Sequence, residues 1–331
     1  MYLRSTTPFS ALPLLIRFPA RLPCVLAILF VCLLMVAGCT RMPGTGDTTL
    51  KPKDMGELEE ILVQKPIEVD QFRLRGPFGV SKRDNIRLNY APKAAIVADL
   101  YLSAHPDPGP LLIIVHGYDA SKEAHALQGF HLASWGVHTL TVQLPKAGPW
   151  LENGRRLAAL VRMIRQSPKL LDTRIDMNRI ILAGHSFGGV AVSVALSEGV
   201  SVTGAVLLDP ATKERGMPAL LAKIAQPVMV LGADRQVSQT RNRDTFYRYI
   251  RRNVFEISMR DASHEDGQYP SQSVVDGAGV DSYVTEEGQV TFVSALTASV
   301  LSLSSTGSFQ QAWRSFDEGL KSGRFADPKQ K

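Results

Sequence analysis

The sequence predicts a single α/β domain built on an open, mostly parallel sheet with helices on both faces. Apolar runs of strand length alternate with segments of helical periodicity, which is typical of such sheets. Most of the runs are continuously apolar, as strands covered on both faces must be. The composition is 45% hydrophobic and 21% charged, which indicates a globular protein and excludes a disordered chain or a protein with many membrane spans.

Seven strands are expected, each bounded by Gly, Pro or Asp. They lie at residues 94–102, 110–117, 137–144, 179–186, 204–210, 227–234 and 254–259. Between the third and the fourth, residues 152–167 predict an amphipathic helix, because their apolar side chains recur at intervals of three and four. The residues of this stripe are Leu157, Leu160, Val161 and Ile164. The helix is therefore expected to lie on the sheet.

Two further helices are expected nearer the C-terminus. Residues 240–252 combine an apolar stripe of Phe246, Tyr249 and Ile250 with the surrounding arginines Arg241, Arg243, Arg248, Arg251 and Arg252. We expect these arginines on a solvated face, with contact to lipid headgroups as the alternative. Residues 309–321 predict a terminal helix.

Charge and motif content exclude several classes of function. The formal net charge is +6, but the 39 residues at the N-terminus hold three arginines and no acid, so the remaining chain carries 34 basic against 31 acidic residues. This balance gives no footprint for nucleic acid. No Cys-His cluster, HExxH motif or GxxxxGK[ST] motif occurs, so no metal site and no phosphate-binding loop is expected.

Residues 1–38 resemble the signal peptide of bacterial lipoprotein precursors. Arg17 and Arg21 precede an apolar run from residue 22 to 36, which ends in Val36-Ala37-Gly38-Cys39. This ending is similar to a lipobox, which implies cleavage before Cys39 and lipidation of its thiol. The alternative is an uncleaved anchor helix, although the run is short for a membrane span. The long segment before Arg17 also leaves open a later start codon.

The leader implies three segments and a location. Residues 39–56 would be the lipidated Cys39 and a flexible tether rich in Gly, Pro, Thr and charge, and residues 57–331 would be the folded domain. All three cysteines lie at or before Cys39, so the domain can form no internal disulfide. Thr40 stands where inner-membrane lipoproteins carry Asp. The resemblance therefore implies a lipid anchor in the bacterial cell envelope, at the outer membrane.

A nucleophile is expected at Ser186. Residues 184–188, Gly-His-Ser-Phe-Gly, fit the pattern G-x-S-x-G, follow an expected strand and open into an apolar segment with helical character. This is the strand-turn-helix setting of a nucleophile elbow, which lifts the serine hydroxyl above the sheet. A structural serine in a Gly-rich turn is the alternative.

A base and an orienting acid complete the expected constellation. His264 is the one histidine that follows Ser186 along the chain, and it lies just beyond the last expected strand. Two carboxylates end the strands between them. Asp234 is the preferred acid because it gives the order Ser, Asp, His. Asp209 is the alternative, and it could instead cap its own turn to Pro210.

Two backbone N–H groups are expected to stabilise an oxyanion. One belongs to Phe187, the residue after the nucleophile, and the other to Tyr118, in the turn after the strand that ends near residue 117. Because the donors are backbone groups, the two aromatic side chains remain available to shape a pocket.

These motifs together resemble the α/β-hydrolase family over about residues 70–305. The resemblance rests on His116-Gly117-Tyr118, on residues 184–189 and on the positions of Asp234 and His264. It implies an eight-stranded, mainly parallel sheet and hydrolysis of carboxylic esters without a cofactor. The chain looks most like the branch of dienelactone-hydrolase-like, chlorophyllase-like and polyester-hydrolase-like enzymes, although dienelactone hydrolases use Cys where this chain has Ser186.

The space above the sheet is expected to be open. About 16 residues separate the two acid-bearing strands, which leaves no room for a large cap domain. Residues 265–289 lack periodicity and could form a rim in which Asp266, Tyr269 and Tyr283 line an acyl or alcohol pocket. A plain surface loop is the alternative.

The sequence thus predicts a membrane-tethered serine hydrolase that acts on a small-molecule or lipid-like ester. The alternatives are an acyltransferase or an amide or thioester hydrolase with the same residues, and a catalytically silent binding lipoprotein. The sequence does not determine the acyl and alcohol groups or the oligomeric state.

Overall fold

The computed structural model describes residues 67–235, 243–270, 274–275, 281–282, 284–306 and 309–331. The chain divides into two units, Met1–Val63 and Gln64–Lys331, and the described residues all belong to the second. The expected leader, Cys39, the tether and the expected domain start at residue 57 lie outside the described residues. Among the described helices, none is both long and apolar enough to cross a membrane.

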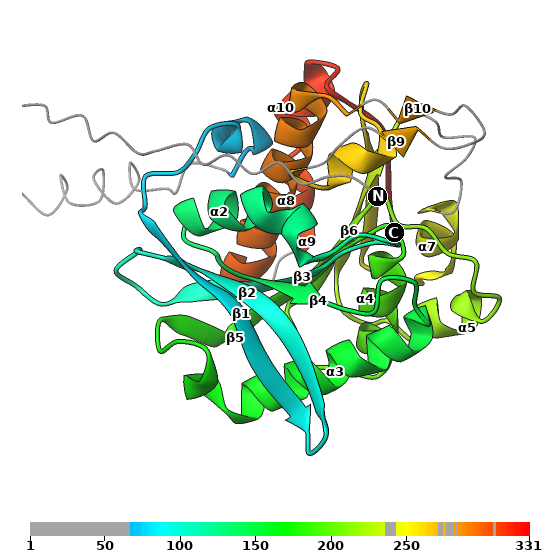
Figure 1. Cartoon of the computed structure of the whole chain (residues 1–331). Helices are drawn as coiled ribbons and strands as arrows, with labels where there is room; N and C mark the ends of the chain where they lie inside the picture. Colours follow the sequence, from blue (N-terminus) through cyan, green and yellow to red (C-terminus); the bar gives the residue numbers. More distant parts are fainter. Residues whose placement is uncertain (1–66, 236–242, 271–273, 276–280, 283, 307–308) are drawn as a thin grey trace, which may run out of the picture. The chain divides into compact units, whose positions relative to one another are not determined.

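A nine-stranded sheet forms the centre of the domain, in the order β1-β2-β4-β3-β5-β6-β7-β8-β11 (Figure 1). Strands β3 to β8 run parallel, whereas β1, β2 and β11 pair antiparallel with their neighbours. The strands are β1 (Val80–Ala91), β2 (Ala94–Ser103), β3 (Gly109–Val115), β4 (His138–Gln143), β5 (Ile175–His185), β6 (Gly204–Leu208), β7 (Val228–Ala233), β8 (Val254–Met259) and β11 (Phe325–Gln330). The predicted α/β class is confirmed, and all seven expected strands are present.

Helices cover both faces of this sheet. They are α2 (Ala126–Ser134), α3 (Trp150–Gln166), α4 (Gly188–Ser197), α5 (Met217–Leu221), α7 (Arg243–Tyr249), α8 (Glu286–Thr306), α9 (Phe309–Arg314) and α10 (Asp317–Lys321). Short 3₁₀ turns are η1 (Val69–Phe72), η2 (Lys122–His125), η3 (Pro168–Leu170) and η4 (His264–Gly267), and β9 (Val274–Val275) pairs with β10 (Asp281–Ser282). The helices α3, α4, α5 and α7 pack on one face of the sheet, and α2 and α8 pack on the other (Figure 1).

The two faces follow from the alternation of side chains along each buried strand. On β3, Leu111, Ile113 and Val115 belong to the core that α3 and α4 cover, whereas Leu112 and Ile114 belong to the core that α2 and α8 cover. Both sets are fully buried. A continuously apolar run therefore serves two cores at once, which is why these strands read as apolar throughout.

The predicted amphipathic helix is α3, and its four stripe residues are fully buried. The helix expected at 240–252 is the shorter α7, in which Phe246 is fully buried but Tyr249 is exposed. Arg243 of this helix is also buried, so the prediction of a solvated face is wrong for that residue.

The structure adds strands and a helix that the sequence did not indicate. Strand β1 alternates between exposed and half-buried residues, and β11 adds a ninth strand to the eight that the resemblance implies. Helix α8 mixes buried serines and threonines with its apolar residues, so its periodicity is weak. The expected terminal helix forms as α9 and α10. Between β6 and β7 the chain forms only the five-residue α5, which agrees with the expected lack of a cap domain.

Candidate active site

Ser186 lies in the sharp turn between β5 and α4. Its φ of 52° is in the left-handed region, which strains a residue with a Cβ and is the mark of a nucleophile elbow. The backbone holds this conformation firmly: Ser186 N–H donates to the carbonyl of Leu208 at 3.0 Å, and its own carbonyl accepts from Gly189 and Ala211 at 2.9 and 3.1 Å. The strain is thus supported by β6 and the start of α4.

Close backbone contacts explain the glycines of the motif. A methyl group on Gly188 would lie 2.6 Å from the carbonyl oxygens of Val115 and His116, where no Cβ fits. The first turn of α4 can therefore approach the end of β3, and the loop after β3 lies directly beside Ser186. Ser186 is only 7% exposed in the resulting site.

His264 and Asp209 form a short, direct hydrogen bond. The Nδ1–H of His264 donates to Oδ2 of Asp209 at 2.6 Å, and Asp209 is fully buried. His264 begins η4, after β8, and Asp209 directly follows β6. Such a bond sets the tautomer and orientation of an imidazole, leaving Nε2 free to accept a proton.

The structure thus corrects the preferred acid. Asp234 follows β7, and its backbone N–H donates to the carbonyl of Met259 at the end of β8. Its carboxylate is not the partner of His264. Burial raises the pKa of Asp234, and its Oδ1 finds no hydrogen-bond partner among the described residues. Asp209 lies at the end of the neighbouring strand with a φ of 38°, a conformation that Asp tolerates better than most residues. Chain order favoured Asp234, whereas the backbone turn at Asp209 decides which carboxylate reaches the imidazole.

His185 links the turn of Ser186 to the loop of His264. Its Nε2–H donates to the backbone carbonyl of His264 at 2.9 Å, and the two rings lie 4.6 Å apart. Burial lowers the pKa of His185 well below its ordinary range, so this histidine is neutral at pH 7. His185 therefore holds the loop that carries His264 against the end of β5, beside Ser186. The sequence indicated it only as a neighbour of the motif.

The side chains of Tyr118 and Phe187, the residues expected to carry the oxyanion donors, lie close together. Within the described part of the chain, neither the N–H of Tyr118 nor that of Phe187 has a hydrogen-bond acceptor. The Tyr118 and Phe187 rings are 6.3 Å apart, and Trp150 stacks on Phe187 at 5.8 Å. Tyr118 is 62% exposed. Two unpaired amides and a set of aromatic rings thus surround the same turn.

Gly117→Ala should lower turnover by about 10- to 100-fold, because sub-ångström displacement of reacting groups has costs of that order. A methyl group at Gly117 would lie 2.9 Å from the Cβ of Ser186, so either the turn or the nucleophile must move. The measurement is the kcat of both proteins on a nitrophenyl ester, with thermal unfolding alongside. Gly216→Ala is the matched control, since a methyl group there meets nothing within 4 Å. Equal activity of the two variants would contradict this arrangement.

The rim predicted at residues 265–289 is only partly described. Asp266 is fully buried and accepts hydrogen bonds from the backbone N–H groups of Ser263 and Thr285 at 2.7 and 2.8 Å, so it supports the loop. Tyr283 lies outside the described residues. Tyr269 lines a pocket.

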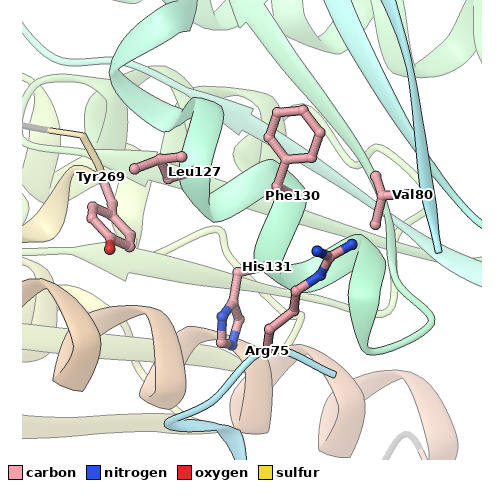
Figure 2. A pocket seen from close by; sticks show the side chains of 6 residues that line it. All are labelled: Arg75, Val80, Leu127, Phe130, His131 and Tyr269. Atoms are coloured by element: carbon pink, nitrogen blue, oxygen red, sulfur yellow. The ribbon is translucent and has the colours of Figure 1, made fainter. Parts of the chain in front are cut away.

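The pocket at Tyr269 measures about 360 Å³ and is separate in its lining from the Ser186 site. Figure 2 shows its six lining residues, which come from α2, the segment between η1 and β1, the start of β1 and the loop after η4: Arg75, Val80, Leu127, Phe130, His131 and Tyr269. Tyr269 is tied to α2 because its carbonyl accepts from the Leu127 N–H at 2.9 Å. None of Ser186, His264 and Asp209 lines it.

Known proteins are similar to this chain in sequence. The model of the Alpha/beta hydrolase family matches residues 112–314. Cutinase 1 from Thermobifida cellulosilytica is 25% identical over 161 residues, which cover 48% of this chain and 59% of the relative. Bis(hydroxyethyl) terephthalate hydrolase from Streptomyces coelicolor is 28% identical over 173 residues, covering 51% and 53%.

A cutinase from Thermobifida fusca is 25% identical over 161 residues, which cover 48% of this chain and 52% of the relative. The chain therefore spans between half and three fifths of the length of the curated relatives it matches.

Proposed function

Because the chain belongs to the alpha/beta hydrolase family, we propose that it is a serine hydrolase that cleaves carboxylic esters through Ser186, His264 and Asp209. The observation that carries the proposal is the 2.6 Å bond between His264 and the buried Asp209, on a loop that His185 ties to the strained turn of Ser186. The distant relatives named as cutinases and as an ester hydrolase support the same class.

The proposed reaction proceeds in two steps. His264 Nε2 takes the proton of the Ser186 hydroxyl as the oxygen attacks the ester carbonyl, and Asp209 stabilises the imidazolium that forms. The N–H groups of Tyr118 and Phe187 then donate to the oxyanion. Collapse releases the alcohol, which takes its proton from His264, and leaves an acyl-serine. Water, deprotonated by His264, attacks the acyl-serine. Collapse of this second intermediate releases the acid, and the Ser186 oxygen takes back the proton from His264.

We further propose that the ester carries an aromatic or extended apolar group. Tyr118, Phe187 and Trp150 bring aromatic rings to the turn of the nucleophile, where they can stack against such a group. The relative that hydrolyses bis(hydroxyethyl) terephthalate supports an aromatic acyl group. The short connection between β6 and β7, with no inserted cap, fits a bulky substrate.

The first experiment is hydrolysis of nitrophenyl esters of increasing acyl length and of bis(hydroxyethyl) terephthalate by residues 40–331. Turnover with a clear optimum along the series would support the proposal and indicate the acyl group. Labelling by a serine-directed fluorophosphonate without any hydrolysis would instead favour acyl transfer or cleavage of amides or thioesters. A folded protein that neither reacts with the fluorophosphonate nor hydrolyses the esters would contradict the proposal of an enzyme and favour the alternative of a binding lipoprotein.

The activity should fall as the pH drops through a midpoint above 6.5. Burial opposes protonation of His264, but the hydrogen bond and the charge of Asp209 outweigh it and raise the pKa of His264 above its ordinary 6.5. The base acts only when neutral, so activity is lost on the acid side of this raised pKa. The kcat/KM profile between pH 5 and 9 measures it, and a midpoint clearly below 6.5 would contradict the pairing.

The same linkage affects stability in the opposite sense. The protonated imidazole gains from Asp209 in the folded state, so this contribution is fully present below the unfolded pKa of about 6.5 and disappears as the pH rises through the folded pKa. The proposed site is thus most stabilised by this pair where it is least active.

We also propose that Cys39 carries the lipid anchor. The proposal rests on the sequence Val36-Ala37-Gly38-Cys39 after an apolar run. Cells expressing the full chain, fed with a labelled fatty acid, should incorporate the label into the wild type and not into Cys39→Ser. Equal label in both proteins would contradict lipidation at this residue.

A further inference from the structure

Arg243 is a buried cation beside the proposed active site. It is the first residue of α7, and its side chain is 7% exposed. Its guanidinium reaches both neighbouring strands, donating from Nη1 to the carbonyl of Ala233 at 2.6 Å and from Nη2 to Oγ of Ser258 at 2.9 Å. A methyl group on Gly232 would collide with the guanidinium, so β7 makes room for it.

The guanidinium lies between two buried carboxylates. Nη1 is 3.6 Å from Oδ1 of Asp209, and Nε is 3.7 Å from Oε1 of Glu256. Glu256 has a second cation, since Lys329 of β11 donates to it at 3.0 Å and also lies 3.7 Å from Asp244. Within the described ranges, Arg243 is the one permanent cation that pairs with Asp209.

This pairing meets a specific electrostatic need. A fully buried carboxylate is costly unless its charge is compensated. His264 cannot supply the compensation in the resting site, because the imidazole must be neutral to accept the proton of Ser186. Arg243 can, because a guanidinium stays charged at every relevant pH.

We infer that Arg243 is a positioning residue that holds Asp209 in place for His264. Arg243 lies beside Oδ1 of Asp209, whereas His264 bonds to the other carboxylate oxygen, Oδ2. Arg243 also donates to the carbonyl of Ala233, and the N–H of Ala233 donates to the same Oδ1 at 3.1 Å. The inference rests on the proposed function, and it adds a residue that contacts Asp209 on the side away from His264. Because Asp209 separates it from the imidazole, Arg243 should affect kcat and not KM.

Loss of the Arg243 charge should also shift the pH dependence, which loss of a purely structural arginine would not do. The titratable groups around His264 are Asp209 from the end of β6, His185 from the end of β5, and Glu265 beside it in η4. Removing the positive charge of Arg243 leaves the negative charge of Asp209 less balanced, which favours the imidazolium. The acid limb of the activity should therefore move to higher pH.

The test compares Arg243→Gln, which removes the charge, with Arg243→Lys, which keeps the charge but loses the planar fork. Arg248→Gln is the matched control, because Arg248 lies exposed in the same helix. The measurements are kcat and KM for a nitrophenyl ester, the pH dependence of fluorophosphonate labelling, and the NMR titration of the His264 imidazole. All use the full chain.

Arg243→Gln should raise the midpoint of both pH curves by at least about half a unit, as expected for loss of a nearby charge. Its kcat should fall by about 10-fold or more, the scale expected when a catalytic group loses orientation, with KM within about twofold. Arg243→Lys should keep the wild-type midpoint with a smaller loss of kcat. Arg248→Gln should match the wild type throughout.

Unchanged midpoints in Arg243→Gln, or equal shifts in Arg248→Gln, would overturn the inference. Should Arg243→Gln not fold, the double variant with Glu256→Gln removes one charge of each sign from the cluster and takes its place, with a smaller expected shift in the same direction. A wild type that folds but neither labels nor hydrolyses ester would disprove the proposed function. The imidazole titration of His264 would still decide the role of Arg243 in that case.

Discussion

Ser186→Ala should reduce ester hydrolysis by about 10⁴-fold or more, since removal of a catalytic serine costs up to roughly 10⁶ in kcat. The hydroxyl is the group that would form the acyl-enzyme, and no neighbouring side chain can replace it. The variant should fold normally, because Ala removes one atom from a position held by backbone hydrogen bonds to Leu208, Gly189 and Ala211. The measurement is kcat on the best nitrophenyl ester, together with fluorophosphonate labelling.

Ser193→Ala is the matched control for this experiment. Ser193 is fully buried in α4, seven residues after Ser186, and its Oγ has no hydrogen-bond partner among the described residues. Its loss should leave labelling and turnover within about twofold of the wild type, because an unpaired hydroxyl contributes little. Labelling that survives in Ser186→Ala, or vanishes in Ser193→Ala, would refute the assignment of the nucleophile.

Asp209→Asn should lower kcat by about 10³- to 10⁴-fold, whereas Asp234→Asn should stay within a few-fold of the wild type. The amide that replaces the Asp209 carboxylate would retain its shape but could not carry the charge that steadies the imidazolium, and it would favour the wrong tautomer of His264. Asp234 has no contact with that imidazole, so its substitution removes nothing from the reaction. Both kcat values are measured on the same ester.

The pH profile distinguishes the two carboxylates a second time. Asp209 raises the pKa of His264, so any residual activity of Asp209→Asn should have its acid limb at lower pH than the wild type. Asp234→Asn should leave the limb in place. A large loss in Asp234→Asn with an active Asp209→Asn would restore the acid that chain order favours.

Much of the fold could be predicted from the sequence because strands buried on two faces leave a strong local signal. Runs such as residues 110–117 and 227–234 are apolar over their whole length and end at Gly, Pro or Asp. Strand β1 left no such signal, since its residues alternate between exposed and half-buried. Helix α8 was not predicted, because serines and threonines interrupt its apolar residues. Most of these serines and threonines are buried in the folded chain.

In the site, local motifs indicated the turn of Ser186 and the loop of Tyr118, because each is a short stretch of chain whose backbone conformation follows from its own residues. Chain order indicated His264, the one histidine after Ser186. The choice between Asp209 and Asp234 depends on something else. Both carboxylates follow neighbouring parallel strands, and chain order does not state which of them turns toward the imidazole.

Arg243 shows the same division most clearly. Periodicity placed it among arginines expected on a solvated face of a helix. In the folded chain it lies buried between Asp209 and Glu256, because α7 packs against β7 and β8, near Asp209 after the end of β6 and Glu256 within β8. By itself, the sequence determined the layers of the domain and the chemical types of the site, since these depend on local pattern. Only the tertiary structure decided which charges meet, because the low-dielectric contacts join residues far apart in the chain.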